Sequence, residues 1–161
     1  VIHIAVNIKK CDIMKRTIRI MMIAVCCIIS CSIMANAGDD KPIAVSALPI
    51  KAQALLNNHF SRHKVVLATA ESGVVSKSYD VVLRNGTKLE FDKKGNLTEI
   101  DCKRGIVPVR LIPRPIRIYL RNNYPHQPVK KLEIKKKEYE VELANGLDLT
   151  FNKHFQLTDI D

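Results

Sequence analysis

The sequence predicts an exported α+β protein, built as a tandem repeat in which each copy is one helix packed on a roughly four-stranded antiparallel sheet. Three features predict this: a signal-peptide-like N-terminal segment, a duplicated block with the alternating pattern of strands, and an amphipathic helix before each block. The chain has 161 residues, 47% of them hydrophobic, and a formal charge of +10. This length fits one domain or two small ones and excludes a large multidomain enzyme.

The N-terminal region has the order of a secretory signal peptide. A basic segment ending at Arg19 precedes the apolar run IMMIAVCCIISCSIM, the small-x-small site Ala35-Asn36-Ala37 and a polar stretch. The apolar run has about 15 residues, fewer than the roughly 20 that a membrane-spanning helix needs. We therefore predict that residues 1–37 are an upstream extension, with the true start at Met14, and a signal peptide cleaved after Ala37.

Two other routes remain open. Ile28-Ile29-Ser30-Cys31 loosely fits a bacterial lipoprotein box in which Cys31 is lipidated, and the apolar run could remain as an uncleaved anchor. Cleavage after Ala37 leaves 124 residues with 21 basic and 15 acidic side chains, and Cys102 as the single cysteine. The expected mature chain is periplasmic, has no transmembrane span and forms no intramolecular disulfide.

The duplicated block comprises residues 79–101 (YDVVLRNGTKLEFDKKGNLTEID) and 139–161 (YEVELANGLDLTFNKHFQLTDID), with 12 of 23 positions identical. Apolar and polar residues alternate in both copies, as in strands with one buried face. Asn85-Gly86 is typical of a type I′ hairpin, and Gly95 suits the left-handed position of a second turn. Because Phe155 replaces Gly95 in the second copy, we expect that turn to differ and to place an aromatic ring at an exposed tip.

A helix is predicted before each block. Residues 49–63 carry an apolar stripe with Leu56 and Phe60, and residues 114–124 carry one with Leu120. Between each helix and its hairpin lies one further strand, at residues 64–71 and 129–136 respectively.

The chain after the signal peptide thus divides into a first repeat at residues 38–104 and a second at 105–161, linked by the segment 103–112. One face of each sheet is apolar and needs its helix as a cover, whereas the other face is polar and free. The two four-stranded sheets could join edge to edge.

These motifs resemble a known family. The pattern Y-x-V-x-L-x-N-G-x-x-L-x-F-D-K-x-G-N-L, the stretch at residues 111–125 and the second Y-x-V-x-L-x-N-G-L are similar to exported PepSY-like, β-lactamase-inhibitor-like proteins of Bacteroidetes-type bacteria. The resemblance covers nearly all of the mature chain, and implies the tandem repeat and a periplasmic address. It implies no demonstrated activity and no catalytic motif. The chain departs from the pattern at residues 152–156, which lack the glycine, and at Leu97 and Leu157, where an aromatic is expected.

Three groups of residues could carry chemistry but fit structural roles better. His59 and His63 are four apart on a predicted helix, but a zinc site normally has three or four protein ligands. Asp92 and Asn96 begin a loose calcium-like pattern, yet Asp, Gly and Asn are also the residues of a hairpin turn. Cys102 has no catalytic signature around it. We predict no catalytic residue, no metal site and no cofactor.

Residues 129–142 mix lysine with glutamate. The lysines there could bind an acidic partner, although Lys–Glu pairs between neighbouring strands explain the same residues. Nucleic acid is not expected as a partner, because an exported protein rarely meets it.

We predict a non-enzymatic periplasmic binding module that holds a protein or peptide of the cell envelope on the free sheet face. Phe155 is a candidate anchor, because aromatic side chains dominate many binding interfaces. The other candidate residues face away from the predicted helices: Asp80, Val82, Arg84, Lys88, Glu90, Glu140, Glu142, Asp148 and Thr150.

Two alternatives belong to other classes. A small molecule or an ion could bind in a pocket between helices and sheet, lined by Tyr79, Tyr119 and Tyr139. A stress-induced envelope protein without a specific ligand would also have this sequence pattern.

Overall fold

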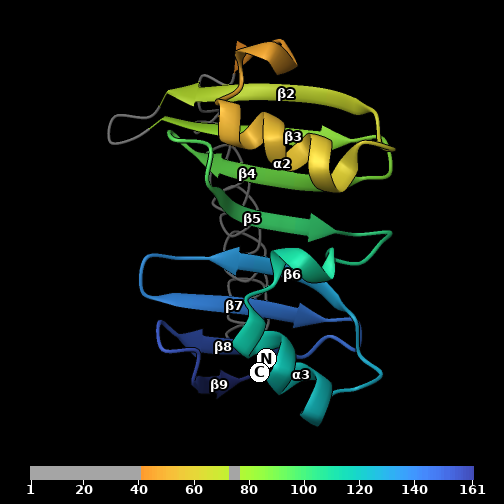
Figure 1. Ribbon diagram of the computed structural model, residues 1–161, viewed down its shortest axis with the longest axis vertical. Coiled ribbons are helices and arrows are strands. Elements are labelled where there is room, and N and C mark those ends of the chain that lie inside the picture. Colours follow the sequence, from red (N-terminus) through yellow and green to blue (C-terminus); the bar gives the residue numbers. More distant parts are fainter. Residues whose placement is uncertain (1–40, 73–76) are drawn as a thin grey trace, which may run out of the picture. The chain divides into compact units, whose positions relative to one another are not determined.

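A computed structural model describes residues 41–72 and 77–161 (Figure 1). The predicted upstream extension, signal peptide, cleavage site and lipidation site lie outside the described residues. All of the described residues belong to the unit Gly38–Asp161.

The described residues form one antiparallel sheet of nine strands, in which each strand pairs with its neighbours in the chain. The strands are β1 (Lys41–Pro42), β2 (Val65–Ser72), β3 (Lys77–Leu83), β4 (Thr87–Asp92), β5 (Leu97–Cys102), β6 (Val129–Ile134), β7 (Glu138–Leu143), β8 (Asp148–Asn152) and β9 (Leu157–Ile160). The helices are α2 (Ile50–Phe60) and α3 (Arg114–Asn123), each preceded by a 3₁₀ turn, η2 (Val45–Ala47) and η3 (Val109–Leu111). Figure 1 shows α2 beside β3 and β4, and α3 beside the strands from β7 to β9.

The predicted fold class is wrong. The two copies of the block join edge to edge, as the sequence allowed, because β5 pairs with β6 through Glu99↔Glu133, Ile100↔Leu132 and Asp101↔Lys131, and the result is one sheet in place of two repeats. The described chain is mainly β, with helices of 11 and 10 residues beside nine strands, so neither α+β nor a tandem repeat of a helix on four strands describes it. The physical reason is that pairing β5 with β6 satisfies two strand edges that separate sheets would leave with unpaired N–H and C=O groups.

A ninth strand, β1, was not predicted. Its two residues pair with β2 at Lys41↔Ala70 and Pro42↔Thr69. A strand this short, with a proline that has no N–H to donate, has too weak a periodic signal to be detected from the sequence.

The two predicted strand faces agree with the structure. On β3, Val81 and Leu83 are buried while Asp80 and Val82 are partly exposed, and β7 repeats this alternation. The predicted type I′ turn at Asn85-Gly86 is wrong in type, because it requires a positive φ at both residues and only Gly86, at 86°, has one. Gly86 N donates instead to Leu83 O at 2.9 Å, so the turn encloses Arg84 and Asn85 and Gly86 takes the left-handed position after it.

The helices pack their predicted stripes onto the covered face of the sheet. Leu56 and Phe60 of α2 and Leu120 of α3 are buried. The helix α2 ends at Phe60, three residues earlier than predicted. Within residues 41–72 and 77–161, neither helix has the length and hydropathy of a membrane span.

The buried side chains of the two halves form one core. Phe91 of β4 and Phe151 of β8 are fully buried at equivalent positions. Ile100 and Leu132, which face each other where β5 meets β6, are also fully buried. The core therefore continues across the boundary that the sequence places between two repeats.

The β8–β9 turn, expected to differ from the β4–β5 turn, has the same backbone shape. Gly95 has a φ of 78° and Phe155 a φ of 61°, so both take the left-handed conformation. A bulky residue rarely adopts this conformation, which is why the sequence predicted another turn. Phe155 is partly buried against the core and is not at an exposed tip.

Candidate functional site

The candidate site is the face of the sheet that the helices leave open. Its side chains alternate along each strand with the buried core residues, as on β4, where Lys88 and Glu90 are exposed between buried Thr87, Leu89 and Phe91. Eight of the sequence-predicted residues lie on this face: Asp80, Val82, Lys88, Glu90, Glu140, Glu142, Asp148 and Thr150.

Strand register brings five carboxylates of this face into one line, which we call the acidic row. It is made of directly opposed residues on five adjacent strands: Asp80↔Glu90, Glu90↔Glu99, Glu99↔Glu133 and Glu133↔Glu140. Neighbouring strands lie about 4.8 Å apart, so the row extends over about 19 Å. Like charges directly opposite each other destabilise a sheet, so the row has a cost for folding.

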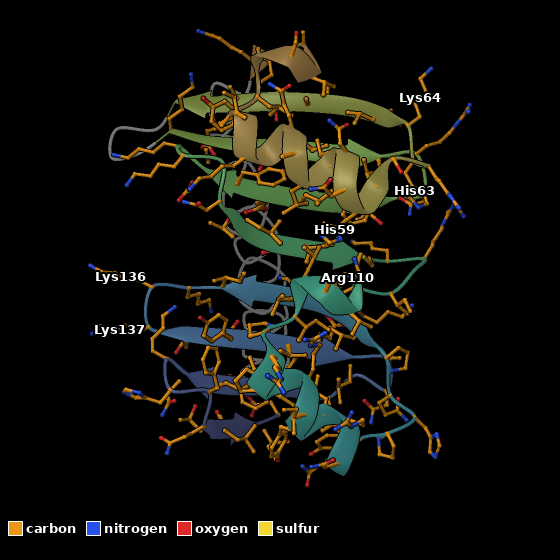
Figure 2. The ribbon with its side chains drawn as sticks, in the orientation of Figure 1. His59, His63, Lys64, Arg110, Lys136 and Lys137 are labelled. Carbon is orange, nitrogen blue, oxygen red and sulfur yellow. The ribbon has the colours of Figure 1, made fainter. Side chains whose placement is uncertain are left out.

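Two lysines neutralise part of the acidic row. Lys131 Nζ lies 3.2 Å from Glu99 Oε1 and 3.8 Å from Glu133 Oε2. Lys135 Nζ lies 3.7 Å from Glu133 Oε1 and donates a hydrogen bond to Glu140. These contacts confirm the predicted pairing of lysine with glutamate between strands. Figure 2 shows that Lys136 and Lys137 instead project outward from the β6–β7 turn.

The β4 end of the row is less well neutralised. Within the described chain, Glu90 forms no ion pair. Loss of solvation and the negative charges of Glu99 and Asp80 raise the pKa of Glu90. Loss of solvation also raises the pKa of Glu133, although the charge of Lys135 opposes the shift.

A shallow hollow lies beside the row, over β6 to β8. Its volume is about 270 Å³, and five of its seven lining residues are acidic: Glu133, Glu140, Glu142, Asp148 and Asp161, with Lys131 and Thr150. The hollow thus brings together the four second-copy candidates other than Phe155.

Two predicted residues lie away from the acidic row. Arg84 follows the last residue of β3 in an exposed turn, where its backbone N–H donates to Lys64 O at 2.8 Å. The ring of Phe155 stacks on Tyr139, with centroids 5.2 Å apart, on the helix-covered side of the sheet.

Sequence reasoning missed Glu99, Glu133 and Lys131 as members of the site. The alternation in β5 and β6 assigns these residues to the polar face. Their place at the centre of the row depends on β5 pairing with β6, which no hairpin motif indicates.

The other chemical candidates have structural roles. The carboxylate of Asp92 accepts hydrogen bonds from Lys94 N at 2.8 Å, Asn96 N at 2.9 Å and Asn96 Nδ2 at 2.8 Å, which confirms the hairpin-turn interpretation. Burial raises the pKa of the buried Cys102 thiol, whereas a nucleophilic thiol needs a lowered pKa.

The histidine pair does not share one helix. His59 is in α2, whereas His63 lies beyond its end (Figure 2). Among the residues that the structure describes, no cluster of three or more His, Cys, Asp or Glu side chains could hold a metal ion.

The three tyrosines proposed to line a pocket make separate contacts. Tyr79 is buried, with the ammonium of Lys77 5.2 Å from its ring centroid. Tyr119 meets Phe151 edge-on at 5.4 Å, and Tyr139 stacks on Phe155.

Comparison with known proteins places these features in a family. The profile of the family described as "Putative beta-lactamase-inhibitor-like, PepSY-like" matches residues 77–159. No curated protein matches the sequence.

Three solved structures are similar over most of the chain, and all three are described as periplasmic. A DUF2874-family protein from Bacteroides vulgatus is 47% identical, with a TM-score of 0.76, and the match covers 78% of this chain and 99% of that chain. A protein from Bacteroides thetaiotaomicron, described as a "putative calcium-regulated periplasmic protein", is 51% identical, with a TM-score of 0.75 and coverage of 76% and 97%. A second Bacteroides vulgatus protein, of unknown function, is 36% identical, with a TM-score of 0.72 and coverage of 76% and 98%.

Proposed function

Since the chain belongs to the PepSY-like family, we propose that it is a non-enzymatic periplasmic module that binds a protein or peptide of the cell envelope on the open face of its sheet. The predicted signal peptide and the periplasmic description of the three similar structures support the periplasmic location. The raised pKa of the Cys102 thiol supports a role without nucleophilic catalysis.

The acidic row is the observation that carries the proposal. Four glutamates oppose one another directly across four strands, although alternating charges would make the sheet more stable. A basic partner compensates this cost on binding, because its cations supply the charges that Glu90 lacks. The protein as a whole is basic, so the row would also orient such a partner toward this face.

The geometry favours an extended partner segment. Its residues advance about 3.3 Å each, so about six residues span the 19 Å of the row, and every second side chain faces the sheet. A segment that alternates lysine or arginine with small residues therefore matches the row.

The test uses an eight-residue peptide that alternates lysine with threonine, and fluorescence anisotropy as the readout. We expect the wild-type protein to bind this peptide and to ignore the same peptide with glutamate in place of lysine. The double variant Glu90→Gln/Glu133→Gln is expected to bind at least about tenfold more weakly, which corresponds to about 1.4 kcal/mol.

The design separates binding from folding. Both substitutions remove carboxylates whose pKa is raised, so they relieve repulsion and leave the fold at least as stable. Glu71→Gln, opposite Ser78 at one end of the face and outside the row, is the control for the removal of one carboxylate, which is half the charge change of the double variant. Equal binding by the wild type and the double variant, or a loss with Glu71→Gln of the same size, would contradict the proposal.

A divalent cation is the second candidate ligand. The description of one relative as a "putative calcium-regulated periplasmic protein" favours it, although the carboxylates of the described residues form no cluster of three or more that could hold a metal ion. Calcium chloride added to the peptide titration distinguishes the two. If calcium displaces the peptide at concentrations at which the same ionic strength of sodium chloride does not, the face binds the ion.

A further inference from the structure

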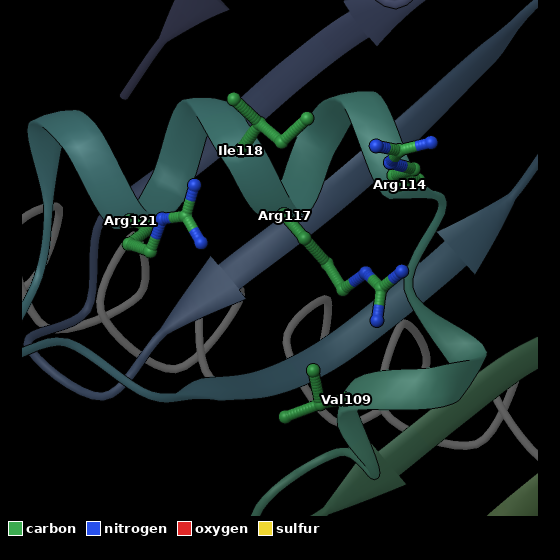
Figure 3. A pocket seen from close by; sticks show the side chains of 5 residues that line it. All are labelled: Val109, Arg114, Arg117, Ile118 and Arg121. Atoms are coloured by element: carbon green, nitrogen blue, oxygen red, sulfur yellow. The ribbon is translucent and has the colours of Figure 1, made fainter.

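A second charged surface, opposite in sign, lies on α3. Arg114, Arg117 and Arg121 follow one another at spacings of three and four residues, so they share one flank of the helix. With Val109 of η3 and Ile118 they line a hollow of about 380 Å³ (Figure 3). Figure 3 shows Arg117 extending from α3 toward the η3 turn that carries Val109.

The arginines have no internal counter-charge. Between Asp101 and Glu133 the sequence contains eight lysines and arginines and no carboxylate. In the described part of the chain, none of the three arginines forms an ion pair. Like charges one turn apart destabilise a helix, so this flank has a cost that an anion would remove.

Arg117 also has an unsatisfied donor. Its Nε is buried and has no hydrogen-bond partner, and it is the single buried side-chain nitrogen or oxygen atom in this condition among the described residues. Buried polar atoms in native proteins nearly always have a partner, so an exception needs an explanation. An anion in the hollow would supply an acceptor beside this guanidinium.

An apolar groove continues from the arginine hollow. It has a volume of about 180 Å³ and shares Val109, Arg117 and Arg121 with the hollow. Most of its other lining residues are apolar or aromatic: Ile106, Val107, Ile112, Leu120, Tyr124, Pro125, Pro128 and Val129, with Gln127. Ile106 and Val109 are 55% and 58% exposed, so the groove presents apolar surface directly beside the arginines.

We propose that α3 and η3 form a binding site for an amphiphilic anion: a single molecule with an acidic head, held by Arg114, Arg117 and Arg121, and an apolar body in the groove. Guanidinium groups bind phosphate, sulfate and carboxylate heads through paired hydrogen bonds. The apolar body distinguishes this ligand from a simple ion. The site contains no residue of the acidic row, so the test of this proposal is independent of the test of peptide binding.

The test is calorimetric titration of the full chain with three probes: decyl phosphate below its micelle concentration, inorganic phosphate and decanol. We expect decyl phosphate to bind at least about tenfold more tightly than either of the others, because it alone occupies both parts of the site. The double variant Arg114→Gln/Arg121→Gln is expected to lose at least about tenfold in affinity for decyl phosphate. Both arginines are exposed, so the fold is expected to tolerate the change.

Two further variants locate the ligand. Ile106→Asn changes an exposed residue of the groove alone, and it is expected to weaken decyl phosphate while leaving inorganic phosphate unchanged. Arg62→Gln, beyond the end of α2, is the control for charge and is expected to change neither.

Three outcomes would overturn the proposal: equal affinity of the wild type and the arginine double variant for decyl phosphate, decanol binding as tightly as decyl phosphate, or no binding of decyl phosphate at all. The last experiment measures sedimentation of the protein with phosphatidylglycerol vesicles. Sedimentation of the wild type with vesicles, without binding of dissolved decyl phosphate, would replace the proposed site by a membrane-contacting surface.

Discussion

The β4–β5 turn and the β8–β9 turn have the same hydrogen bonds but different residues. Asp92 N donates to Asn96 O and Asn152 N donates to Gln156 O, both at 2.9 Å. The side chains of Asp92 and Asn152 each accept the backbone N–H four residues later, at 2.9 and 3.1 Å. The backbone of the two copies is therefore preserved where the residue at the left-handed position, Gly95 or Phe155, is not.

The two turns differ in what they contact. A Cβ on Gly95 would lie 2.7 Å from Pro49 Cβ and 3.0 Å from Ala52 N, so the start of α2 packs directly on this turn. Lys51 Nζ also donates to Asn96 Oδ1 at 3.0 Å. In the other copy Phe155 stacks on Tyr139, and no equivalent bond joins α3 to the turn among the described residues. The two copies thus share one turn conformation but make different contacts with it. In the first copy the turn at Gly95 packs on the start of α2, which we call the helix seat. In the second copy Phe155 stacks on Tyr139, which we call the aromatic clamp.

The largest expected effect concerns the helix seat. Gly95→Ala is expected to lower the free energy of unfolding by about 2–4 kcal/mol, because it adds backbone strain and a clash with α2. Gly86→Ala is the matched control: its φ is 86°, but nothing lies within 4 Å of the added methyl group, so about 1–2 kcal/mol is expected. Urea unfolding at neutral pH measures both. Equal losses would mean that α2 does not depend on Gly95.

The aromatic clamp gives the next largest effect. Phe155→Ala is expected to cost about 1–3 kcal/mol, because the stacking on Tyr139 and part of the apolar burial are lost. Phe155→Gly removes the same ring but also removes the strain of a φ of 61°, so it is expected to cost about 1 kcal/mol less. Urea unfolding of the two variants measures the difference. If Phe155→Gly were the less stable variant, the left-handed conformation at this residue would be refuted.

The smallest effect is a pH dependence that distinguishes the turns. Burial opposes the shift, but hydrogen bonds from Asn96 and Lys94 lower the pKa of Asp92. A lowered pKa in the folded state means that the ionised carboxylate stabilises the fold above its unfolded pKa of about 4, and that this stabilisation disappears as the pH falls through the lower folded value. The stability of the wild type relative to Asp92→Asn is therefore expected to decrease below about pH 4.

The neutral Asn152 offers the reciprocal experiment for the same measurement. Asn152→Asp is expected to give the β8–β9 turn the acid sensitivity that the β4–β5 turn has, since the same N–H groups point at the side chain. Comparing urea midpoints at pH 3 and pH 7 tests both variants. Parallel pH profiles for the wild type and Asp92→Asn would show that the carboxylate does not act through this turn.

The faces and hairpins of the sheet could be predicted because their signals are local. Alternation fixes which side of β4 or β7 is buried, and Asn85-Gly86 locates the turn between β3 and β4, although it does not give the type of that turn. The candidate residues Glu90 and Glu140 were accordingly assigned to the correct face. The row formed with Glu99 and Glu133 was not predicted, since periodicity specifies a face and says nothing of which strand lies beside it.

The sequence allowed the two copies to join edge to edge, but the register in which β5 pairs with β6 could not be predicted for the same reason. Residues 103–128, including η3 and α3, separate the two strands, and no turn motif links them. The local signals of each copy instead favoured two complete units. The flank of α3 with Arg114, Arg117 and Arg121 was also missed. A helical stripe indicates which residues are buried. Whether Arg117 forms an ion pair depends instead on its distance from every carboxylate in the fold.

The order of the strands has a consequence for how the molecule is made. From β1 to β9 each strand pairs with the strand that precedes it in the chain, and only residues 43–64 and 103–128 form long connections between paired strands of the described chain. Local pairing of this kind favours rapid folding and keeps few strands unpaired at any moment. A chain that emerges with its N-terminus first from a narrow channel can therefore add its strands to the sheet one after another, in the order in which they emerge.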